Sequence, residues 1–249
     1  MIEIKNISVG YQNKSVLCDV TVSFEKEKLT SVVGANGCGK STLLKAMLGI
    51  LPLSSGEIFI DGIALRAMKR NEIAKKVAYL SQGKNTPDMT VEQMVLHGRF
   101  PYLSYPRRYG EEDRKIAREA MDAVGISKLK NKPLYELSGG MRQTAYIAMA
   151  LAQDTDYILL DEPTAYLDIA HQLDLMKLLK ELVNMGKGVI SVMHDIPLAL
   201  DFSDNIVAIG NGSVVADAMP SKICNMSVIG EMFGVKISQI SDNKFYYDY

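Results

Sequence analysis

Residues Val32–Gly49, VVGANGCGKSTLLKAMLG, run from an apolar segment through a glycine-rich loop into a helical pattern. Leu29–Val33 predicts a short buried strand, and Ser41–Leu48 predicts a helix that stops near Gly49. Residues 34–41 match the pattern G-x-x-x-x-G-K-[ST], in which backbone N–H groups and a helix N-terminus surround phosphate. The stretch therefore predicts a nucleotide-binding loop between a strand and a helix.

Two side chains of this loop carry chemistry of their own. Lys40 can reach the β- and γ-phosphates of a nucleotide, and the hydroxyl of Ser41 can ligate Mg²⁺. The alternative is a glycine-rich turn without a ligand, which the flanking strand and helix disfavour. Kinases, GTPases and transport ATPases all use such a loop, so the activity depends on the rest of the chain.

A second apolar strand, Tyr157–Asp161, ends in the two carboxylates of Asp161 and Glu162. Ligands of parallel sheets lie beyond the carboxyl ends of the strands, so Asp161 is expected beside the phosphate loop, where it suits Mg²⁺. Glu162 follows directly and can accept a proton from an attacking water. A solvated charge at a strand end is the alternative for Glu162.

Two further strand-like runs end in polar side chains. Residues 188–193 precede His194, which can bridge the γ-phosphate and the carboxylate that orients water. The alternative is a structural role, which is the more common one for a lone histidine. Residues 77–81 precede Gln82, whose amide can contact Mg²⁺ or its water. His97 and His171 have no such position, and we expect structural or surface roles for both.

Residues 137–143, LSGGMRQ, come just before a predicted helix at Thr144–Gln153. Ser138, Gly139 and Gly140 at this point predict a second helix start that can bind an anion. An ordinary capped helix is the alternative. Since the sequence has one evident phosphate site and two such helix starts, each chain can complete the site of a second chain.

Composition limits the class of protein. The chain has 249 residues, of which 47% are hydrophobic, enough for one large domain or two small lobes. The formal net charge of -1 argues against a nucleic-acid partner. No apolar run has transmembrane length, the start does not resemble a signal peptide, and scattered Cys18, Cys38 and Cys224 favour a reduced cytoplasmic compartment.

Alternating apolar residues predict an antiparallel sheet beside the phosphate-loop core, with Val20, Val22, Phe24, Ile58 and Ile60 facing inward. An amphipathic helix at Asp113–Val124 and the helix at Thr144–Gln153 predict a helical lobe at about 86–155, inserted between Gln82 and Asp161. Residues 206–216 predict a hairpin that turns at Asn211–Gly212. Residues 221–249 form a tail, whose aromatic end at 245–249 we expect to be frayed rather than packed on a partner.

Taken in order, these motifs resemble the ATP-binding subunit of an ABC transporter, with a match from Met1 to about Pro220, the expected ATPase domain. The resemblance rests on residues 34–42, Gln82, residues 137–143, Asp161–Glu162, residues 165–168 and His194. It implies an α/β fold with a P-loop NTPase (RecA-like) core, an N-terminal antiparallel β subdomain and an inserted helical subdomain. It also implies two chains paired head to tail around two ATP.

The resemblance implies a role for each matching residue. Lys40, Gln82, Glu162 and His194 would be catalytic, and Ser41, Gln82 and Asp161 would hold Mg²⁺. Ser138, Gly139 and Gly140 would bind the γ-phosphate of the other chain's ATP. The remaining nucleotide contacts would be Tyr11, stacked on adenine, and Gly34, Asn36, Gly37, Cys38, Gly39, Lys40, Ser41 and Thr42.

Three of these positions need comment. Tyr11 in the turn at residues 10–13 is, on its own residues, equally a surface tyrosine. Met141 stands where the family often has glutamine, and Thr144 where it often has arginine. Because Met141 makes no strong polar contact, one contact to the ribose is in doubt.

Three short segments resemble the branch of the family that serves iron-siderophore, haem and vitamin B12 importers: residues 96–102, 151–153 and 167–172. This implies a polytopic membrane permease docked in a groove edged by residues 82–90, and indirectly a substrate-binding protein. The chain would lie at the cytoplasmic face of the membrane as a peripheral subunit. Another cargo remains open, and Phe100, Tyr102 and Tyr105 are equally ordinary aromatics of a surface loop.

Two other classes of function compete. A soluble ABC-type ATPase that remodels nucleic acid or ribosomes usually carries tandem cassettes or long insertions, whereas this chain has one cassette and no basic patch. A P-loop kinase for a small molecule has no evident need for Ser138–Gly140 or for a dimer.

Overall fold

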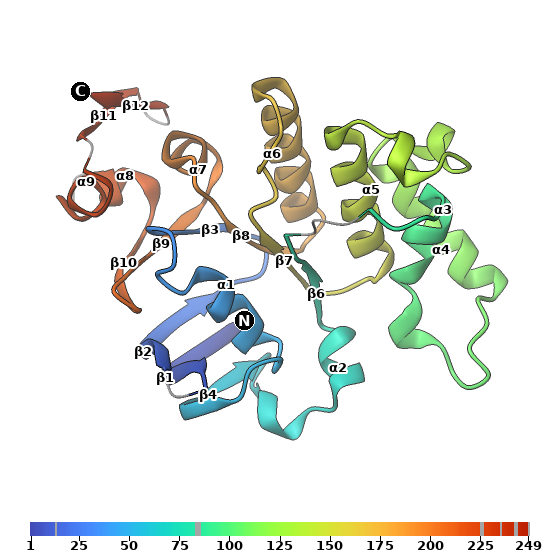
Figure 1. Ribbon diagram of the computed structural model, residues 1–249, viewed down its shortest axis with the longest axis horizontal. Helices are drawn as coiled ribbons and strands as arrows, with labels where there is room; N and C mark the ends of the chain where they lie inside the picture. Colours follow the sequence, from blue (N-terminus) through green and yellow to red (C-terminus); the bar gives the residue numbers. More distant parts are fainter. Residues whose placement is uncertain (13, 83–85, 225–226, 235, 242–243, 249) are drawn as a thin grey trace.

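The structure is a computed structural model, and it describes residues 1–12, 14–82, 86–224, 227–234, 236–241 and 244–248. Within these residues, a six-stranded sheet in the order β10-β9-β3-β8-β7-β6 forms the centre of the molecule (Figure 1). Neighbouring strands are parallel except at the β9–β10 edge. The strands are β3 (Leu29–Val33), β6 (Val77–Leu80), β7 (Tyr157–Asp161), β8 (Gly188–Val192), β9 (Asn205–Gly210) and β10 (Ser213–Ala218).

Both faces of the central sheet are covered, so β3, β7 and β8 are buried along their whole length. One face packs against α6 (Ile169–Asn184) and α7 (Ile196–Phe202). The other packs against α1 (Lys40–Met47) and a second sheet. The predicted strands β3, β6, β7 and β8 and the helix α1 are confirmed to within one residue at each end, whereas the hairpin predicted at 206–216 spans 205–218.

The second sheet is antiparallel and belongs to the N-terminal part of the chain. Its order is β2-β1-β4-β5, with β1 at Ile2–Tyr11, β2 at Lys14–Phe24, β4 at Leu53–Ile60 and β5 at Ile63–Ala64. The inward-facing residues predicted from the alternation, Val20, Val22, Phe24, Ile58 and Ile60, are all buried. The hairpin β9–β10 also turns at Asn211–Gly212, where both residues have positive φ.

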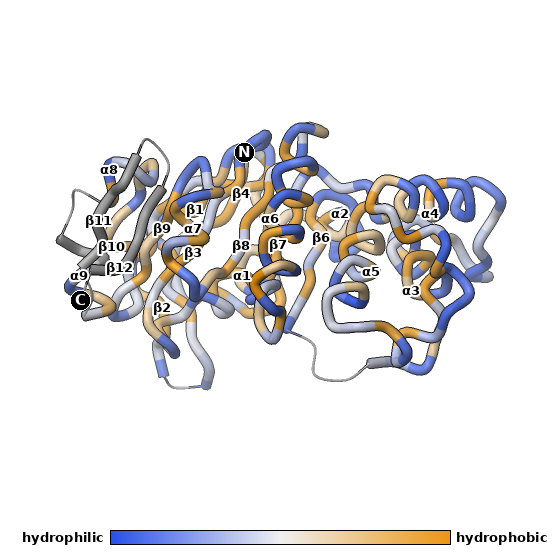
Figure 2. The backbone as a smooth tube through the Cα atoms, turned by 90° about the horizontal axis from the view of Figure 1, so that it is seen from above, coloured by the Kyte–Doolittle hydropathy of each residue, from blue (hydrophilic) through white to orange (hydrophobic). Residues whose placement is uncertain are grey.

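A lobe of helices lies between β6 and β7 in the chain, and Figure 2 shows it at one end of the molecule. It contains α3 (Val91–His97), α4 (Glu111–Ala123) and α5 (Gly139–Ala152), packed around their own apolar cluster. The short elements η1 (Leu65–Ala67) and α2 (Arg70–Ala74) precede β6, while η2 (Phe100–Tyr102), η3 (Ser127–Leu129) and η4 (Leu134–Glu136) connect the helices of the lobe.

The start of α5 differs from the prediction by five residues. The helix begins at Gly139, not Thr144, so the two glycines lie in its first turn. Ser138 is the reason, because its hydroxyl caps the helix by accepting from the backbone N–H of Met141 at 3.3 Å. The helix therefore includes the two glycines, which the prediction placed before its first residue.

The tail also differs from the prediction. Its elements are α8 (Pro220–Cys224), α9 (Ser227–Phe233), β11 (Lys236–Ser241) and β12 (Lys244–Asp248). The expectation of a frayed end is wrong for residues 244–248, because β12 pairs antiparallel with β11 and lies near α7. Phenylalanine and tyrosine favour strands, which explains this pairing. Residue 249 lies outside the described residues, and the boundary at residue 220 stays a prediction.

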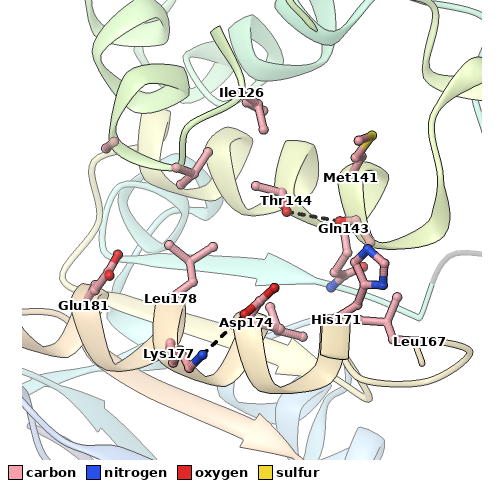
Figure 3. Close-up of a pocket in the computed structure, with 14 residues that line it drawn as sticks. Ile126, Met141, Gln143, Thr144, Leu167, His171, Asp174, Lys177, Leu178 and Glu181 are labelled. Atoms are coloured by element: carbon pink, nitrogen blue, oxygen red, sulfur yellow. Dashed lines mark hydrogen bonds and ion pairs between the residues drawn. The ribbon is translucent and has the colours of Figure 1, made fainter. Parts of the chain in front are cut away.

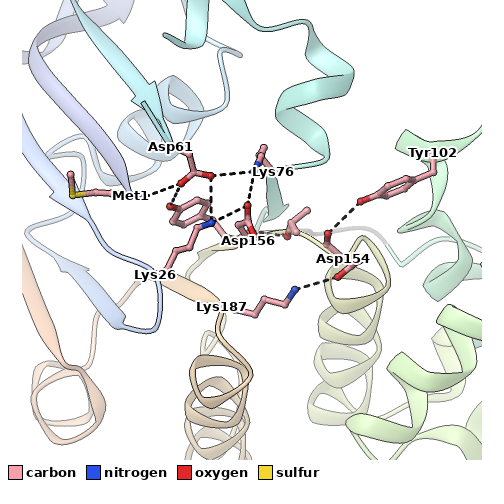
Figure 4. A network of polar contacts seen from close by, with 10 residues as sticks. Met1, Lys26, Asp61, Lys76, Tyr102, Asp154, Asp156 and Lys187 are labelled. Carbon is pink, nitrogen blue, oxygen red and sulfur yellow. Dashed lines mark hydrogen bonds and ion pairs between the residues drawn. The ribbon is translucent and has the colours of Figure 1, made fainter. Parts of the chain in front are cut away.

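A group of charges joins the two sheets near the first residue of β7 (Figure 4). Asp61 accepts hydrogen bonds from the Met1 ammonium and from the hydroxyl of Tyr157, both at 2.8 Å. Lys76 donates to Asp61 at 3.2 Å and to Asp156 at 2.8 Å. The first residue of β7 is thus fixed to the antiparallel sheet. No helix in the described part of the chain has the length and apolar character needed to cross a membrane.

Candidate nucleotide site

The phosphate loop leaves β3 and enters α1 through backbone that glycine permits. Gly39 caps α1 with φ 111°, in the left-handed region. A Cβ at Gly39 would lie 2.5 Å from Cδ2 of Leu17 in the buried antiparallel sheet. The antiparallel sheet therefore holds the loop from outside, and glycine is needed here for both conformation and space.

The Lys40 side chain is folded over the loop that precedes it. Its Nζ donates to the carbonyl oxygens of Gly34 at 2.7 Å and Ala35 at 3.0 Å, and the residue is 5% exposed. The ammonium therefore lies on the inner side of the loop. Thr42 is buried in the same turn of α1, whereas Asn36 and Gly37 are exposed and Cys38 is half-buried.

Strand register brings Asp161 to the level of the loop. Val32 pairs with Val192, and Val192 pairs with Asp161, so three neighbouring strands end together. The Ser41 hydroxyl donates to Oδ1 of Asp161 at 2.8 Å. The predicted proximity of Ser41 and Asp161 is therefore present in the structure.

Tyr79 on β6 completes the surroundings of this carboxylate. Its hydroxyl donates to Oδ2 of Asp161 at 3.2 Å. Burial, with the Asp161 charge and this hydrogen bond, raises the pKa of Tyr79 far above its ordinary value, so the phenol stays a donor. Both oxygens of Asp161 thus have a fixed partner, and the aspartate is 7% exposed.

Glu162 lies between the two polar side chains predicted from the ends of β6 and β8. Gln82 donates from Nε2 to one carboxylate oxygen at 2.7 Å, and Nε2 of His194 lies 2.6 Å from the other. Glu162 itself has φ 54°, a left-handed conformation that is uncommon for a residue with a side chain. Such conformations concentrate at functional sites, where the surrounding structure maintains them.

The start of α5 lies in the helical lobe, away from the phosphate loop. No hydrogen bond or ion pair among the described residues joins Ser138, Gly139 or Gly140 to residues 34–42. Met141 is exposed, and the hydroxyl of Thr144 donates to the carbonyl of Gly140 at 3.0 Å. Among the described residues, hydrogen bonds and ion pairs thus link Ser41 to Asp161 and Glu162 to Gln82 and His194, and none links the Ser138 segment to the phosphate loop.

Two hollows border these parts. One, of about 410 Å³, is lined by Gln82, Thr86, Gly139, Arg142, Gln143, Tyr146, Ala165, Tyr166 and Leu167. It coincides with the start of the groove predicted at residues 82–90, of which residues 83–85 lie outside the described residues. The other, of about 590 Å³, borders Asn36, Gly37 and Cys38. Tyr11 ends β1 and is exposed, as an adenine-stacking ring would be.

Comparison with known proteins identifies the family. The sequence pattern described as ABC transporter matches residues 17–165. The chain belongs to the ABC transporter family. It is therefore an ATP-binding subunit, and an ATPase whose hydrolysis is coupled to transport.

Named relatives align over nearly the whole ABC subunit. The petrobactin import ATP-binding protein YclP of Bacillus subtilis is 42% identical over 98% of this chain and 97% of its own length. The iron(3+)-hydroxamate import protein FhuC of the same organism is 37% identical, over 96% of this chain and 89% of its own length. The ferric enterobactin transport protein FepC of Escherichia coli has the same identity and coverage.

Solved structures agree with the fold. A bacterial ABC transporter cassette solved as a dimer matches with a TM-score of 0.75 and 31% identity, over 88% of this chain and 99% of that one. The subunit cbiO1 of Clostridium perfringens, part of the transporter complex cbiONQ, has a TM-score of 0.82 and 27% identity, over 92% of each chain. The predicted α/β fold with a P-loop core is confirmed.

Sequence reasoning missed two residues beside the predicted ones. Tyr79 was not singled out within its predicted strand, although it is the next-to-last residue of β6 and its hydroxyl reaches Asp161 at the end of β7. His171, expected to be structural or on the surface, lies against Gly140, and this specific contact was not predicted. No local pattern marks either contact, because each depends on how separate elements pack.

Proposed function

We propose that this chain is the ATP-hydrolysing subunit of an importer for iron–siderophore complexes. The support for the cargo is the set of relatives, whose names refer to petrobactin, iron(3+)-hydroxamate and ferric enterobactin. Two copies would close around two ATP and drive a polytopic permease from the cytoplasmic face of the membrane, with a substrate-binding protein supplying the cargo. Haem and cobalamin are the alternative cargoes.

The placement of Glu162 carries the hydrolytic part of the proposal. A carboxylate held by Gln82 on one side and His194 on the other can accept a proton from a water aimed at the γ-phosphate. Lys40 and the loop amides would neutralise and orient the phosphates, and His194 would contact the γ-phosphate. We assign the nucleotide contacts to Tyr11, residues 34 and 36–42 of the same chain, and Ser138–Gly140 of the other.

The donors near Asp161 suit Mg²⁺. The hydroxyl of Ser41 and the carboxylate of Asp161 are hard oxygen donors 2.8 Å apart, with the Gln82 amide close to the neighbouring Glu162. No group of three or more His, Cys, Asp or Glu side chains in the described residues makes a closed metal site. Mg²⁺ is commonly held by one or two carboxylates together with substrate phosphates, which fits this sparse set. When bound, the ion would neutralise charge on the β- and γ-phosphates.

The separation of Ser138–Gly140 from the phosphate loop supports a site shared by two copies. The first turn of α5 has N–H groups capable of binding phosphate, but its own chain's loop lies elsewhere. ATP would bind the closed pair more strongly than the open one and so shift the population toward closure. Helices of the permease docked in the groove near Gln82 would move with that closure.

Glu162→Gln tests the hydrolytic mechanism. The amide keeps the shape of the side chain but cannot act as the base, so turnover is expected to fall by at least about a hundredfold. ATP binding is expected to persist, and a long-lived dimer is expected in size-exclusion chromatography with ATP and Mg²⁺. If the variant's turnover, measured as phosphate release, were close to that of the unsubstituted protein, Glu162 would not be the base.

Partner and cargo need separate measurements. Co-purification of a polytopic membrane protein supports the transporter subunit, whereas co-purified nucleic acid supports a soluble ABC-type ATPase. Transfer of phosphate to an acceptor instead of water would indicate a kinase. In cells that lack the chain, uptake of iron supplied as a siderophore is expected to stop, while normal iron uptake together with lost haem or cobalamin uptake would refute the cargo.

A further inference from the structure

The first turn of α5 is packed against the segment that follows Glu162 in the same chain. An ideal Cβ placed on Gly140 would lie 2.2 Å from Cδ2 and 2.8 Å from Cγ of His171. One placed on Gly139 would lie 3.7 Å from Cδ2 of Leu167. Both glycines therefore face the same neighbouring segment, and the His171 ring occupies the space where a side chain on Gly140 would be.

His171 is itself held by Asp168. Its Nδ1 lies 2.7 and 2.8 Å from the two carboxylate oxygens of Asp168, so the ring donates to this acceptor. Asp168 also caps α6, because its Oδ1 accepts from the backbone N–H of His171 at 2.9 Å. These contacts fix the ring relative to the first turn of α6.

A short turn connects Asp168 to the proposed base. The backbone N–H of Ala165 donates to the carbonyl of Glu162 at 3.2 Å, and that of Leu167 donates to Thr164 at 3.3 Å. Figure 3 shows the His171 ring reaching from α6 toward the first turn of α5, near Met141 and Gln143. Within α5, the hydroxyl of Thr144 donates a hydrogen bond to the carbonyl oxygen of Gly140.

We propose that His171 is a positioning residue that sets the place of the Ser138–Gly140 segment relative to the Glu162–Asp168 turn. The inference rests on the proposed function, in which that segment binds the γ-phosphate of the other chain's ATP. The ring would act as a spacer between α6 and α5, so that a γ-phosphate meets correctly placed N–H groups. His171 affects closure of the dimer and does not touch the nucleotide bound in its own chain.

Three variants in the Glu162→Gln background test this role: His171→Ala, His171→Asn and His171→Leu. Lys177→Ala, also on α6, is the matched control. Asparagine keeps a donor near the position of Nδ1 and leucine keeps bulk, while alanine keeps neither. Lys177 forms an ion pair with Asp174 at 3.5 Å, and its side chain is well exposed. Thermal melting first establishes that each variant is folded.

Dimer formation is then titrated with MgATP by analytical ultracentrifugation, and ATP binding to the monomer is measured at protein concentrations too low for pairing. His171→Ala is expected to raise the ATP concentration for half-maximal dimerisation roughly tenfold, since small misplacements of binding groups have large effects. Its monomer affinity is expected to be unchanged. His171→Asn and His171→Leu are expected to recover part of the loss, and Lys177→Ala to match the parent.

With Glu162 present, the same substitution is expected to raise KM for ATP more than it lowers kcat. If the parent dimerises and His171→Ala matches it, the positioning role is refuted and the proposed function stands. If the parent stays monomeric with ATP, the proposed function and the role that rests on it are both refuted.

A second experiment tests the contact between Gly140 and the His171 ring in the absence of nucleotide. Gly140→Ala is expected to lower the melting temperature when His171 is present, because the methyl group meets the ring. In the His171→Ala background the same change is expected to be neutral or stabilising, since alanine favours helices over glycine. An equal loss in both backgrounds would show that the ring does not set the position of α5.

Discussion

At the scale of single residues, Glu162 shows how a side chain of ordinary type acquires a special position. Its φ of 54° turns the chain sharply after β7, so the carboxylate lies between the ends of β6 and β8. Such strain costs on the order of 1–3 kcal/mol, which the surrounding structure must offset. The position of Glu162 after a buried strand was predictable, but the conformation that aims it was not.

Cys38 provides a test of the phosphate loop by chemical modification. Its half-buried thiol lies within the loop, close to Gly34, so a maleimide adduct there would fill the space of the phosphates. Maleimide is expected to abolish ATP hydrolysis, and ATP is expected to protect. Mass spectrometry would locate the adduct.

Cys18 is also exposed, so the control is a protein with Cys18→Ala and Cys224→Ala, in which Cys38 is the only thiol. This protein is expected to lose activity at the same rate as the unchanged one. Equal modification of Cys38 with and without ATP would argue that the nucleotide does not occupy the loop.

At the scale of elements, the residues of the first turn of α5 determine where this helix starts. The Ser138 cap and the absence of side chains at Gly139 and Gly140 allow the helix to start close to the 165–168 turn. Sequence reasoning recognised this segment as an anion-binding helix start but placed the helix itself from Thr144. A glycine pair favours a flexible entry by propensity, and here the cap and packing outweigh that preference.

Ser138→Arg tests whether this element acts on the neighbouring chain. The larger cation would block the phosphate-facing end of α5, so turnover and ATP-dependent pairing are expected to be lost while the monomer still binds ATP. Lys40→Ala is also expected to lose turnover and ATP-dependent pairing, but here the damage lies in the chain's own phosphate loop.

Mixing the two variants shows whether the phosphate loop and the Ser138 segment act across two chains or within one. A pair formed from one chain of each kind has one site with an intact loop and an intact Ser138 segment. ATP-dependent pairing is therefore expected to reappear in the mixture although neither variant pairs alone. A mixture as inactive as its components would indicate that both motifs act within one chain.

At the scale of the whole molecule, the core joins two sheets and a lobe of helices, and the charges around Asp61 join the sheets. Burial raises the pKa of Asp61, but hydrogen bonds from the Met1 ammonium, Tyr157 and Lys76 outweigh it and hold the pKa well below its ordinary value. The ionised form of Asp61 is therefore stabilised more strongly in the folded protein than in the unfolded chain.

Asp61→Asn is therefore expected to lower the free energy of unfolding at pH 7 by about 1–3 kcal/mol, measured by urea denaturation. The folded pKa lies below the unfolded value of about 4, so the contribution is present above that pH and is lost as pH falls below it. The difference between the two proteins is expected to shrink between about pH 5 and pH 2.

The control is Asp174→Asn, which removes an exposed carboxylate paired with Lys177 at 3.5 Å. It is expected to change stability by less than about 0.5 kcal/mol, since exposed ion pairs contribute little. A difference between Asp61→Asn and the unchanged protein that stays constant down to pH 2 would contradict the role of the ionised Asp61.

The sequence by itself determined the phosphate loop, the strands that end at Asp161 and His194, and the inward face of the antiparallel sheet. These features are local, because loop spacing and alternation depend on residues a few positions apart. Only the tertiary structure decided that Tyr79 holds Asp161, that His171 fills the space beside Gly140, and that Tyr157 reaches Asp61. The first and last of these pairs are 82 and 96 residues apart, and such contacts arise only when separate elements pack together.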